Sequence, residues 1–569
     1  MQRKKSEIRK KAGPVIIAFL LILVASGVFL VQKFMPSRER MEPSEYFGEL
    51  EQKEVAVVLQ DHLTDKKGIL EGDDLYLEYS LVRESLNSRF FWDEENQQML
   101  FTTALETYEI PVDSDDYMVD GEERQYGKAI LLQRASGLYL SADFLQLYTN
   151  VQYTLERESS HVLIRNQWGM QLAAVVKKDA AVRYQGGIKS PILTDVHEGD
   201  TVYILDELEN WFEVLTPDGY IGYVQSKRLE DVKEIEVTRE FKEQEYSSIS
   251  LGEKVNLIWH QIDNYDGNAY LEEDTSHMTG VNVISPTWYS VKDNAGEIDS
   301  LASEEYVEKA HAAGLQVWGL INNFSADVDT VTLLSSTKAR RKMVEYLVED
   351  ALRLGLEGIN LDFEYIREET GSSYVQFARE LSIACRKNKL ILSIDVPVPM
   401  DFNYFYDYEE LGTVADYVIM MGYDEHYVGS DAGSVASLSF EENGITGMLT
   451  NIPAEKIISG VPFYTRIWYT VTYSDGSTAV NSESIGMQTV ENTLETYGLT
   501  PTWDDASGQN YVAWNTADGV LCEIWIENEE SLAKKARLVD QYQLGGIAAW
   551  RLGYERASIW KVLAENIGA

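Results

Sequence analysis

The chain has 569 residues, of which 44% are hydrophobic and 25% are charged, and this composition predicts several globular domains. The formal net charge of -44 argues against a nucleic-acid partner, because such a surface repels a polyanion. Two cysteines, Cys385 and Cys522, form neither a disulfide framework nor a zinc pattern. We expect two buried thiols, with a single bridge between them as the alternative.

The N-terminus joins a basic tail, residues 1–13, to an uncharged apolar run, residues 14–31. The run is about long enough to cross a hydrocarbon core of ~30 Å. The basic flank should stay in the cytoplasm and send the rest of the chain outside. We therefore predict a single-pass anchor in the cytoplasmic membrane. A cleaved signal peptide is the alternative, although no small-x-small cleavage site follows the run.

The next segments predict small, non-catalytic modules. Residues 32–52 are polar and contain two prolines, as a stalk would. Residues 53–167 hold short strand-like runs such as VAVVLQ and DLYLEYSLV, which are typical of a β-rich or α+β domain. This segment resembles the copper-amine-oxidase N-terminal-like domain, a spacer fold, and the resemblance implies no bound copper.

Residues 168–236 contain alternating strands and a hairpin turn at Asp218–Gly219. The segment resembles a bacterial SH3 domain, a module that binds cell-wall peptide or acts as a spacer. Trp211 and Tyr220 either line a ligand groove or fill the core of this small barrel.

After a linker at 237–250, residues 251–569 alternate strand-like and helix-like stretches. The eight strand-like runs are KVNLIWHQ, VNVISPTWY, LQVWGLINN, GINLDFEYI, LILSIDVPVP, YVIMMGYDE, KIISGVPFY and GGIAAWRLGY. Eight such β–α units predict a TIM (β/α)8 barrel of the α/β class. The extra material at about 468–526 predicts an α+β insertion that walls the active-site end.

The run GINLDFEYI sets three polar side chains into an apolar strand. Alternation points Asn360, Asp362 and Glu364 toward the barrel axis, with successive residues about 6.5 Å apart. Glu364 comes last and should lie at the strand C-terminus, where this fold carries its chemistry. Neighbouring carboxylates raise one of their two pKa values, which keeps a general acid protonated. The alternative is a buried polar network without a catalytic role.

The longer stretch EGINLDFE resembles the signature of family 18 glycoside hydrolases, Asp-Gly-x-Asp-x-Asp-x-Glu. The resemblance implies that Glu364 is the catalytic acid and that Asp362 assists it. Glu357 replaces the first aspartate of the pattern and Asn360 replaces the second. Because Asn360 removes one charge from the stack, we expect less repulsion on Asp362.

Three other strands carry the same resemblance: MMGYDE, GVPFYTR and GGIAAW. They imply that Tyr423 joins the catalytic group and that Trp550 forms the floor of a sugar subsite. The substrate-binding residues implied by the resemblance are Asn360, Met421, Asp424, Tyr464, Arg466 and Trp550.

The family implies a retaining, substrate-assisted hydrolysis that needs neither a metal nor another cofactor. Its substrate must carry a 2-acetamido group, as peptidoglycan and chitin do. The predicted anchor and SH3 domain favour peptidoglycan, and the combination looks like bacterial wall and spore-cortex N-acetylglucosaminidases. A chitinase and a non-catalytic wall-binding lectin are the alternatives.

Overall fold

The computed structural model describes residues 17–29 and 32–568, and its described part forms two compact units. The first holds the described residues up to 90, 110–118 and 123–243, and the second holds 91–109, 119–122 and the described residues from 244 onward. Residues 17–29 form a helix. The span Ile17–Phe34, with a mean hydropathy of 2.2, is long and apolar enough for a membrane span or a signal sequence. The predicted basic tail and both ends of the predicted anchor, 14–16 and 30–31, lie outside the described residues.

Residues 54–165 contain a seven-stranded sheet in the order β11-β12-β1-β2-β3-β10-β9 and a separate five-stranded sheet, β4 to β8. The elements of the larger sheet are β1 (Glu54–Leu59), β2 (His62–Glu71), β3 (Asp74–Glu78), β9 (Leu131–Arg134), β10 (Gly137–Ser141), β11 (Gln152–Glu156) and β12 (His161–Arg165), with helix α4 (Ala142–Tyr148). The smaller sheet comprises β4 (Phe90–Asp93), β5 (Gln98–Thr102), β6 (Thr107–Pro111), β7 (Asp116–Val119) and β8 (Glu122–Gln125).

The SH3-like domain is a seven-stranded sheet in the order β15-β14-β18-β17-β16-β13-β19. Its strands are β13 (Gly169–Val176), β14 (Ala180–Arg183), β15 (Ile192–Val196), β16 (Thr201–Leu208), β17 (Trp211–Leu215), β18 (Ile221–Gln225) and β19 (Leu229–Val237). Tyr220 is buried, whereas Trp211 is half-exposed. Of the two readings of this aromatic pair, the core role therefore fits Tyr220.

The segment predicted as a stalk is packed near its centre. Helix α2 (Pro43–Phe47) places Phe47 against the rings of His161, 4.2 Å away, and Tyr220, 5.1 Å away. Phe47 thereby joins the sheet that contains β1 and β12 to the SH3-like domain in one apolar cluster. The expectation of a polar stalk over all of 32–52 is wrong at this helix, because burying an aromatic ring outweighs the polar character of its neighbours.

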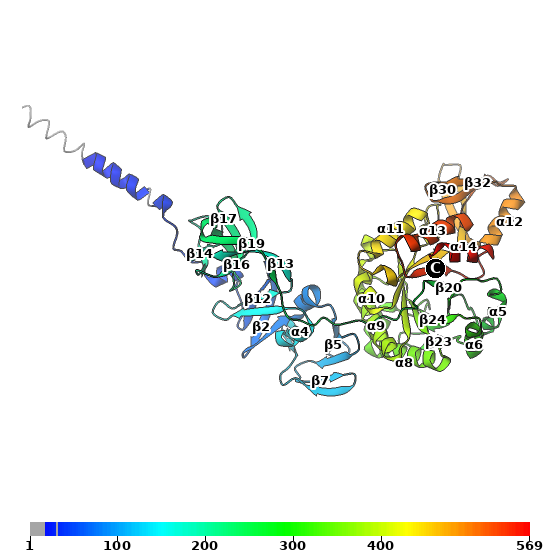
Figure 1. The fold of residues 1–569 in the computed structure, drawn as a ribbon, viewed down its shortest axis with the longest axis horizontal. Helices are drawn as coiled ribbons and strands as arrows, with labels where there is room; N and C mark the ends of the chain where they lie inside the picture. The colour runs from blue at the N-terminus through cyan, green and yellow to red at the C-terminus, as the bar shows by residue number, and fades with distance from the viewer. Residues whose placement is uncertain (1–16, 30–31, 569) are drawn as a thin grey trace, which may run out of the picture. The chain divides into compact units, whose positions relative to one another are not determined.

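All eight predicted strand runs form the barrel, which β21 and β24 close by pairing with each other. Figure 1 shows this barrel ringed by its helices. The strands are β20 (Val255–His260), β21 (Val283–Pro286), β24 (Gln316–Asn322), β25 (Gly358–Asp362), β26 (Ile391–Pro397), β27 (Tyr417–Met421), β28 (Ile457–Pro462) and β34 (Gly546–Trp550). A short hairpin, β22 (Tyr289–Val291) and β23 (Ile298–Ser300), extends the sheet beside β24.

The helices that surround the barrel are α5 (Leu271–Asp274), α6 (Glu304–Ala312), α7 (Thr330–Ser335), α8 (Thr337–Leu354), α9 (Glu368–Asn388), α10 (Tyr408–Val414), α11 (Leu438–Met448), α13 (Glu529–Gln541) and α14 (Ser558–Asn566). Helix α8 matches the predicted stretch TKARRKMVEYLVEDALRLG. Helix α9 contains the predicted stretch SYVQFARELSIACRKN and begins five residues before it, at Glu368. The side chain of Ser336 caps α8, and Gly355 ends it with a φ of 74° that favours glycine.

Alternation along the strands separates two apolar cores. Ile359, Leu361 and Phe363 pack outward with the helices, as predicted. Trp259, Trp318 and other large side chains fill the interior of the barrel. The interior is therefore a packed, dry core, and polar groups placed in it need partners.

The insertion is a five-stranded antiparallel sheet in the order β30-β29-β33-β32-β31 with one helix. Its elements are β29 (Tyr464–Thr472), β30 (Thr478–Gly486), α12 (Met487–Tyr497), β31 (Thr502–Asp504), β32 (Gln509–Asn515) and β33 (Leu521–Ile526). It begins at Tyr464, four residues before the predicted start, because β29 follows β28 with one intervening residue.

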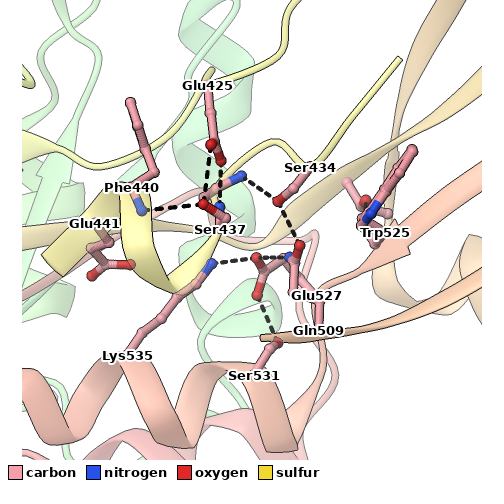
Figure 2. A network of polar contacts seen from close by, with 12 residues as sticks. Glu425, Ser434, Ser437, Phe440, Glu441, Gln509, Trp525, Glu527, Ser531 and Lys535 are labelled. Carbon is pink, nitrogen blue, oxygen red and sulfur yellow. Dashed lines mark hydrogen bonds and ion pairs between the residues drawn. The ribbon is translucent and has the colours of Figure 1, made fainter. Parts of the chain in front are cut away.

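A buried polar network ties the insertion to the barrel helices (Figure 2). Glu527, which follows β33, pairs with Lys535 on α13 and accepts hydrogen bonds from Gln509 and from Ser531. Gln509 in turn accepts a hydrogen bond from Ser434, in the loop after β27. A buried lysine and glutamate that satisfy each other in this way fix the relative position of three elements.

Glu425 provides a second set of contacts that hold the loop after β27. The carboxylate of Glu425 accepts hydrogen bonds from the backbone N–H of Ser437, at 2.7 Å, and from its hydroxyl, at 3.0 Å. Ser437 also caps α11 by accepting from the N–H of Phe440 at 3.1 Å. The loop after β27 is therefore fastened both to α11 and to the insertion.

Glu441, on α11, makes stability depend on pH. It is fully buried, accepts from the Ser459 hydroxyl at 2.7 Å, and burial raises its pKa from 4.5 to about 7 although Lys535 opposes the shift. A raised folded pKa means that this group's stabilisation is present at low pH and is lost as the pH rises toward 7. Relative to E441Q, we expect the wild type to lose on the order of 3 kcal/mol of unfolding free energy between about pH 4.5 and about pH 7.

Urea unfolding of both proteins across that pH range measures this loss. E442Q is the matched control, since Glu442 is less buried and pairs with Tyr542 instead. A wild-type-to-E441Q difference that stays constant with pH contradicts the prediction.

Candidate active site

The amide of Asn360 is the centre of a hydrogen-bond network inside the barrel. Its Oδ1 accepts from the indole N–H of Trp259 at 2.9 Å and from the hydroxyl of Ser285 at 3.0 Å. Its Nδ2 donates to Oδ1 of Asp395 at 2.8 Å. These contacts reach three other strands, β20, β21 and β26, so Asn360 faces the barrel interior as predicted.

Asp362 is the last residue of β25 and is buried. Burial, followed by the negative charges of Asp395 and Glu364, raises its pKa well above the ordinary range. Its Oδ1 has no hydrogen-bond partner among the described residues. A carboxyl group in this position is favoured in its protonated form.

Glu364 lies two residues beyond the end of β25 rather than within the strand. The side-chain amide of Asn323 brackets it: Oδ1 accepts from the Glu364 N–H at 3.0 Å, and Nδ2 donates to the Glu364 carbonyl at 2.8 Å. The carboxyl group is half-buried, and burial, followed by the negative charge of Asp424, raises its pKa. These properties suit a general acid at the strand C-termini.

Tyr423 follows β27 by two residues and approaches the ring of Tyr464, with centroids 6.3 Å apart. Burial raises its pKa well above the ordinary range, and the charges of Asp362, Asp395 and Glu364 add to the shift. Tyr423 is therefore a neutral hydroxyl near the same carboxylates and can donate a hydrogen bond.

Asp424, Tyr464 and Arg466 form a second group beside this one. The Tyr464 hydroxyl donates to Oδ1 of Asp424 at 2.7 Å, and Nη2 of Arg466 lies 3.7 Å from the same oxygen. The carboxylate of Asp424 is exposed, whereas Tyr464 and Arg466 are buried on β29. The first strand of the insertion thus contributes directly to the group.

Trp550 and Met421 end strands β34 and β27, and both are half-buried. The ring of Trp550 lies 6.0 Å from that of Trp259, which donates to Asn360. Trp550 therefore borders the central network. For Met421 the structure gives its place at the end of β27, two residues before Tyr423.

Asp395 is the residue of this site that sequence reasoning missed. It is buried on β26, receives the hydrogen bond from Asn360, and its charge raises the pKa of Asp362. Asn360 removes one charge from the stack, as expected from the sequence, but the neighbouring strand supplies another carboxylate that acts on Asp362. The run LILSIDVPVP carried the signal, since Ser393 and Asp395 alternate within it as the polar residues of β25 do.

Glu357, the other departure from the family pattern, lies away from the acids. Its carboxylate accepts from the N–H of Val317 at 2.9 Å and pairs with His311 at 3.1 Å. These contacts join the start of β25 to the start of β24 and to α6. Glu357 thus supports the end of the barrel opposite the catalytic residues.

The closed (β/α)8 barrel holds Asp362 and Glu364 at its strand C-termini, the end at which this fold carries its chemistry. Residues 287–555 match the model of glycosyl hydrolases family 18, residues 178–230 the bacterial SH3 domain, and residues 58–164 the copper amine oxidase N-terminal domain. Over residues 287–555 the chain is accordingly similar to the family 18 glycosyl hydrolases.

Known proteins support this assignment. The chain is 27% identical to the uncharacterized glycosylase YvbX of Bacillus subtilis, over 51% of this chain and 86% of YvbX. It is 26% identical to the cortical fragment-lytic enzyme of B. subtilis, over 41% of this chain and 55% of that enzyme. A chitinase from Chromobacterium violaceum shares the fold, with a TM-score of 0.50 and 24% identity over 56% of this chain and 99% of that one.

Removing the side-chain amide of Asn323 should misplace Glu364 without removing it. We expect N323A to lower kcat on a cleavable acetamido glycan by about tenfold to a hundredfold, with a smaller change in KM, because catalysis is sensitive to small displacements of the acid. Steady-state kinetics measure the effect.

The matched control is N403A. Asn403 likewise brackets backbone groups, the N–H of Met400 and the carbonyl of Val398, each at 2.9 Å, in the loop after β26. The prediction is wrong if both variants lose stability equally and lose kcat equally.

Proposed function

We propose that this protein hydrolyses β-1,4 bonds that follow N-acetylglucosamine, with peptidoglycan as the substrate and residues 14–31 as its membrane anchor. The observation that carries the proposal is the pair Glu364 and Asp362, whose pKa values burial raises side by side at the C-terminal end of β25. The relationship to a cortical fragment-lytic enzyme and the SH3 domain support a wall substrate.

The reaction is substrate-assisted. Protonated Glu364 donates its proton to the leaving glycosidic oxygen while the acetamido oxygen of the substrate attacks the anomeric carbon. Asp362 accepts the acetamido N–H and stabilises the positive oxazolinium ion, and Tyr423 hydrogen-bonds the acetamido group. Glu364 then removes a proton from water, which attacks the same carbon and restores the original configuration.

The remaining residues shape the sugar subsite. The half-buried face of Trp550 stacks against the apolar face of the pyranose ring. Asp424, held by Tyr464 and Arg466, offers a hydrogen-bonding carboxylate at the rim, and Met421 contributes apolar contact nearby. Asn360, which is fully buried, holds the interior network through Trp259, Ser285 and Asp395.

E364Q should abolish hydrolysis while glycan binding persists, because the amide keeps the shape of the acid and cannot donate the proton. We expect kcat to fall by about a thousandfold or more. The chain from residue 32 onward is incubated with purified peptidoglycan and, separately, with chitin oligomers, and new reducing ends are read by mass spectrometry. E368Q, which changes an exposed carboxylate four residues away, is the matched control.

Products that end in N-acetylglucosamine, formed from peptidoglycan by wild type and E368Q alone, support the proposal. Cleavage of chitin oligomers without cleavage of peptidoglycan would identify chitin as the substrate in place of peptidoglycan. Binding without any cleavage by the wild type contradicts catalysis and makes the protein a lectin of the wall.

A further inference from the structure

Asp395 is a buried carboxylate to which the mechanism above gives no task. Strands β25 and β26 run parallel, with Leu361 paired to Ile394, so Asp362 and Asp395 are the next pair along the two strands. Paired residues of neighbouring strands point to the same face at a strand spacing of about 4.8 Å. The two carboxyl groups therefore lie side by side inside the barrel, at its C-terminal end.

The amide of Asn360 decides which member of this pair holds the charge. Since Oδ1 of Asn360 accepts from Trp259 and Ser285, its Nδ2 is the group that faces Asp395. An N–H donor favours an ionised carboxylate. Asp362 receives no such donor on its buried Oδ1 among the described residues. Burial raises the pKa of Asp395 as well, but the hydrogen bond from Asn360 opposes that shift. Of the two carboxyl groups, Asp395 is therefore the one on which the negative charge is favoured, and Asp362 the one on which the proton is favoured.

We propose that Asp395 is a positioning residue that accepts the proton of Asp362 as positive charge forms on the substrate. The inference rests on the proposed hydrolase function. In this step the O–H bond of Asp362 breaks and an O–H bond forms on Asp395. The step moves one proton and involves no oxidation or reduction. Asp362 becomes negative as the oxazolinium ion appears, so the attraction is stronger in the transition state than before it.

Other titratable groups also face the pair, from the end of β25, from α9, from the loop after β26 and from the loop after β27. They are Glu364, Tyr374, Tyr406 and Tyr423. Burial raises the pKa of each of the three tyrosines above its ordinary value, so they stay neutral near pH 7. The proton balance of the site near neutral pH is therefore set by its carboxyl groups.

The test compares the full-length wild type with D395N and with the exchange N360D/D395N. In the exchange, a carboxylate at position 360 can accept from Trp259 and Ser285, and the amide at position 395 can donate to it. The exchange keeps all three hydrogen bonds, but in the bond between positions 360 and 395 the donor is now the residue at 395. The unfolding transition of each variant is measured first, so that loss of fold is distinguished from loss of chemistry.

For D395N we expect kcat to fall by roughly tenfold or more with little change in KM, and the acid limb of the pH profile to move to higher pH, because Asp362 must then lose its proton to solvent. The exchange should recover kcat to within about threefold of the wild type. A D395N enzyme with wild-type kcat and pH profile overturns the inference. So does a folded double variant that is no more active than D395N.

An infrared measurement separates this inference from the hydrolase function. At neutral pH without substrate, the wild type should show a neutral carboxyl band that is lost in D362N and changes position in D395N, because its hydrogen-bond partner has changed. If the wild type cleaves no glycan, the proposed function fails, yet this band still reports on the pair. Identical spectra of wild type and D362N overturn the assignment of the proton.

Discussion

The site depends on one amide held inside a packed barrel. Two donors, from Trp259 and Ser285, occupy Oδ1 of Asn360 and leave its Nδ2 to face Asp395. An unpaired polar atom is costly in the barrel interior. The hydrogen bonds from Trp259 and Ser285 therefore set the orientation of the Asn360 amide, and this orientation directs its N–H toward Asp395. Asp362 lies close to other carboxylates, and its Oδ1 has no hydrogen-bond partner within the part of the chain that the structure describes.

The two loops that carry Glu364 and Tyr423 are held in place by separate local contacts. Glu364 lies outside regular structure, and the amide of Asn323 gives its backbone the partners that a strand would have given. The loop after β27, which carries Tyr423, is held from behind by Glu425 and by the buried network around Glu527 (Figure 2). Groups that must act together are thus supported by different parts of the chain.

The insertion is part of the site as well as a covering element. Its first strand, β29, supplies Tyr464 and Arg466, and the buried Lys535–Glu527 pair joins its last strand to α13. The ion pair and the hydrogen bonds of Glu527 and Gln509 tie this sheet to α13 and to the loop after β27. The rim carboxylate of Asp424 therefore has a fixed partner before any substrate arrives.

Much of the architecture was readable from the chain. Eight apolar, strand-like runs that alternate with helix-like stretches predicted eight barrel strands. The period-two pattern within GINLDFEYI correctly predicted that Asn360 and Asp362 face inward. Helices α8 and α9 followed from long amphipathic stretches with clear ends. The anchor, the domain boundaries and the catalytic roles remain predictions, since each is a statement about an environment or a reaction that strand and helix patterns do not contain.

The sequence by itself determined which side chains face the barrel axis, because alternation along a strand is a local property of the backbone. Only the tertiary structure decided which of them meet. Asp395 lies beside Asp362, Asn323 brackets Glu364, and Phe47 is buried between two domains, through contacts that join distant parts of the chain. Such contacts follow from strand register, barrel closure and domain packing, which no short stretch of sequence encodes.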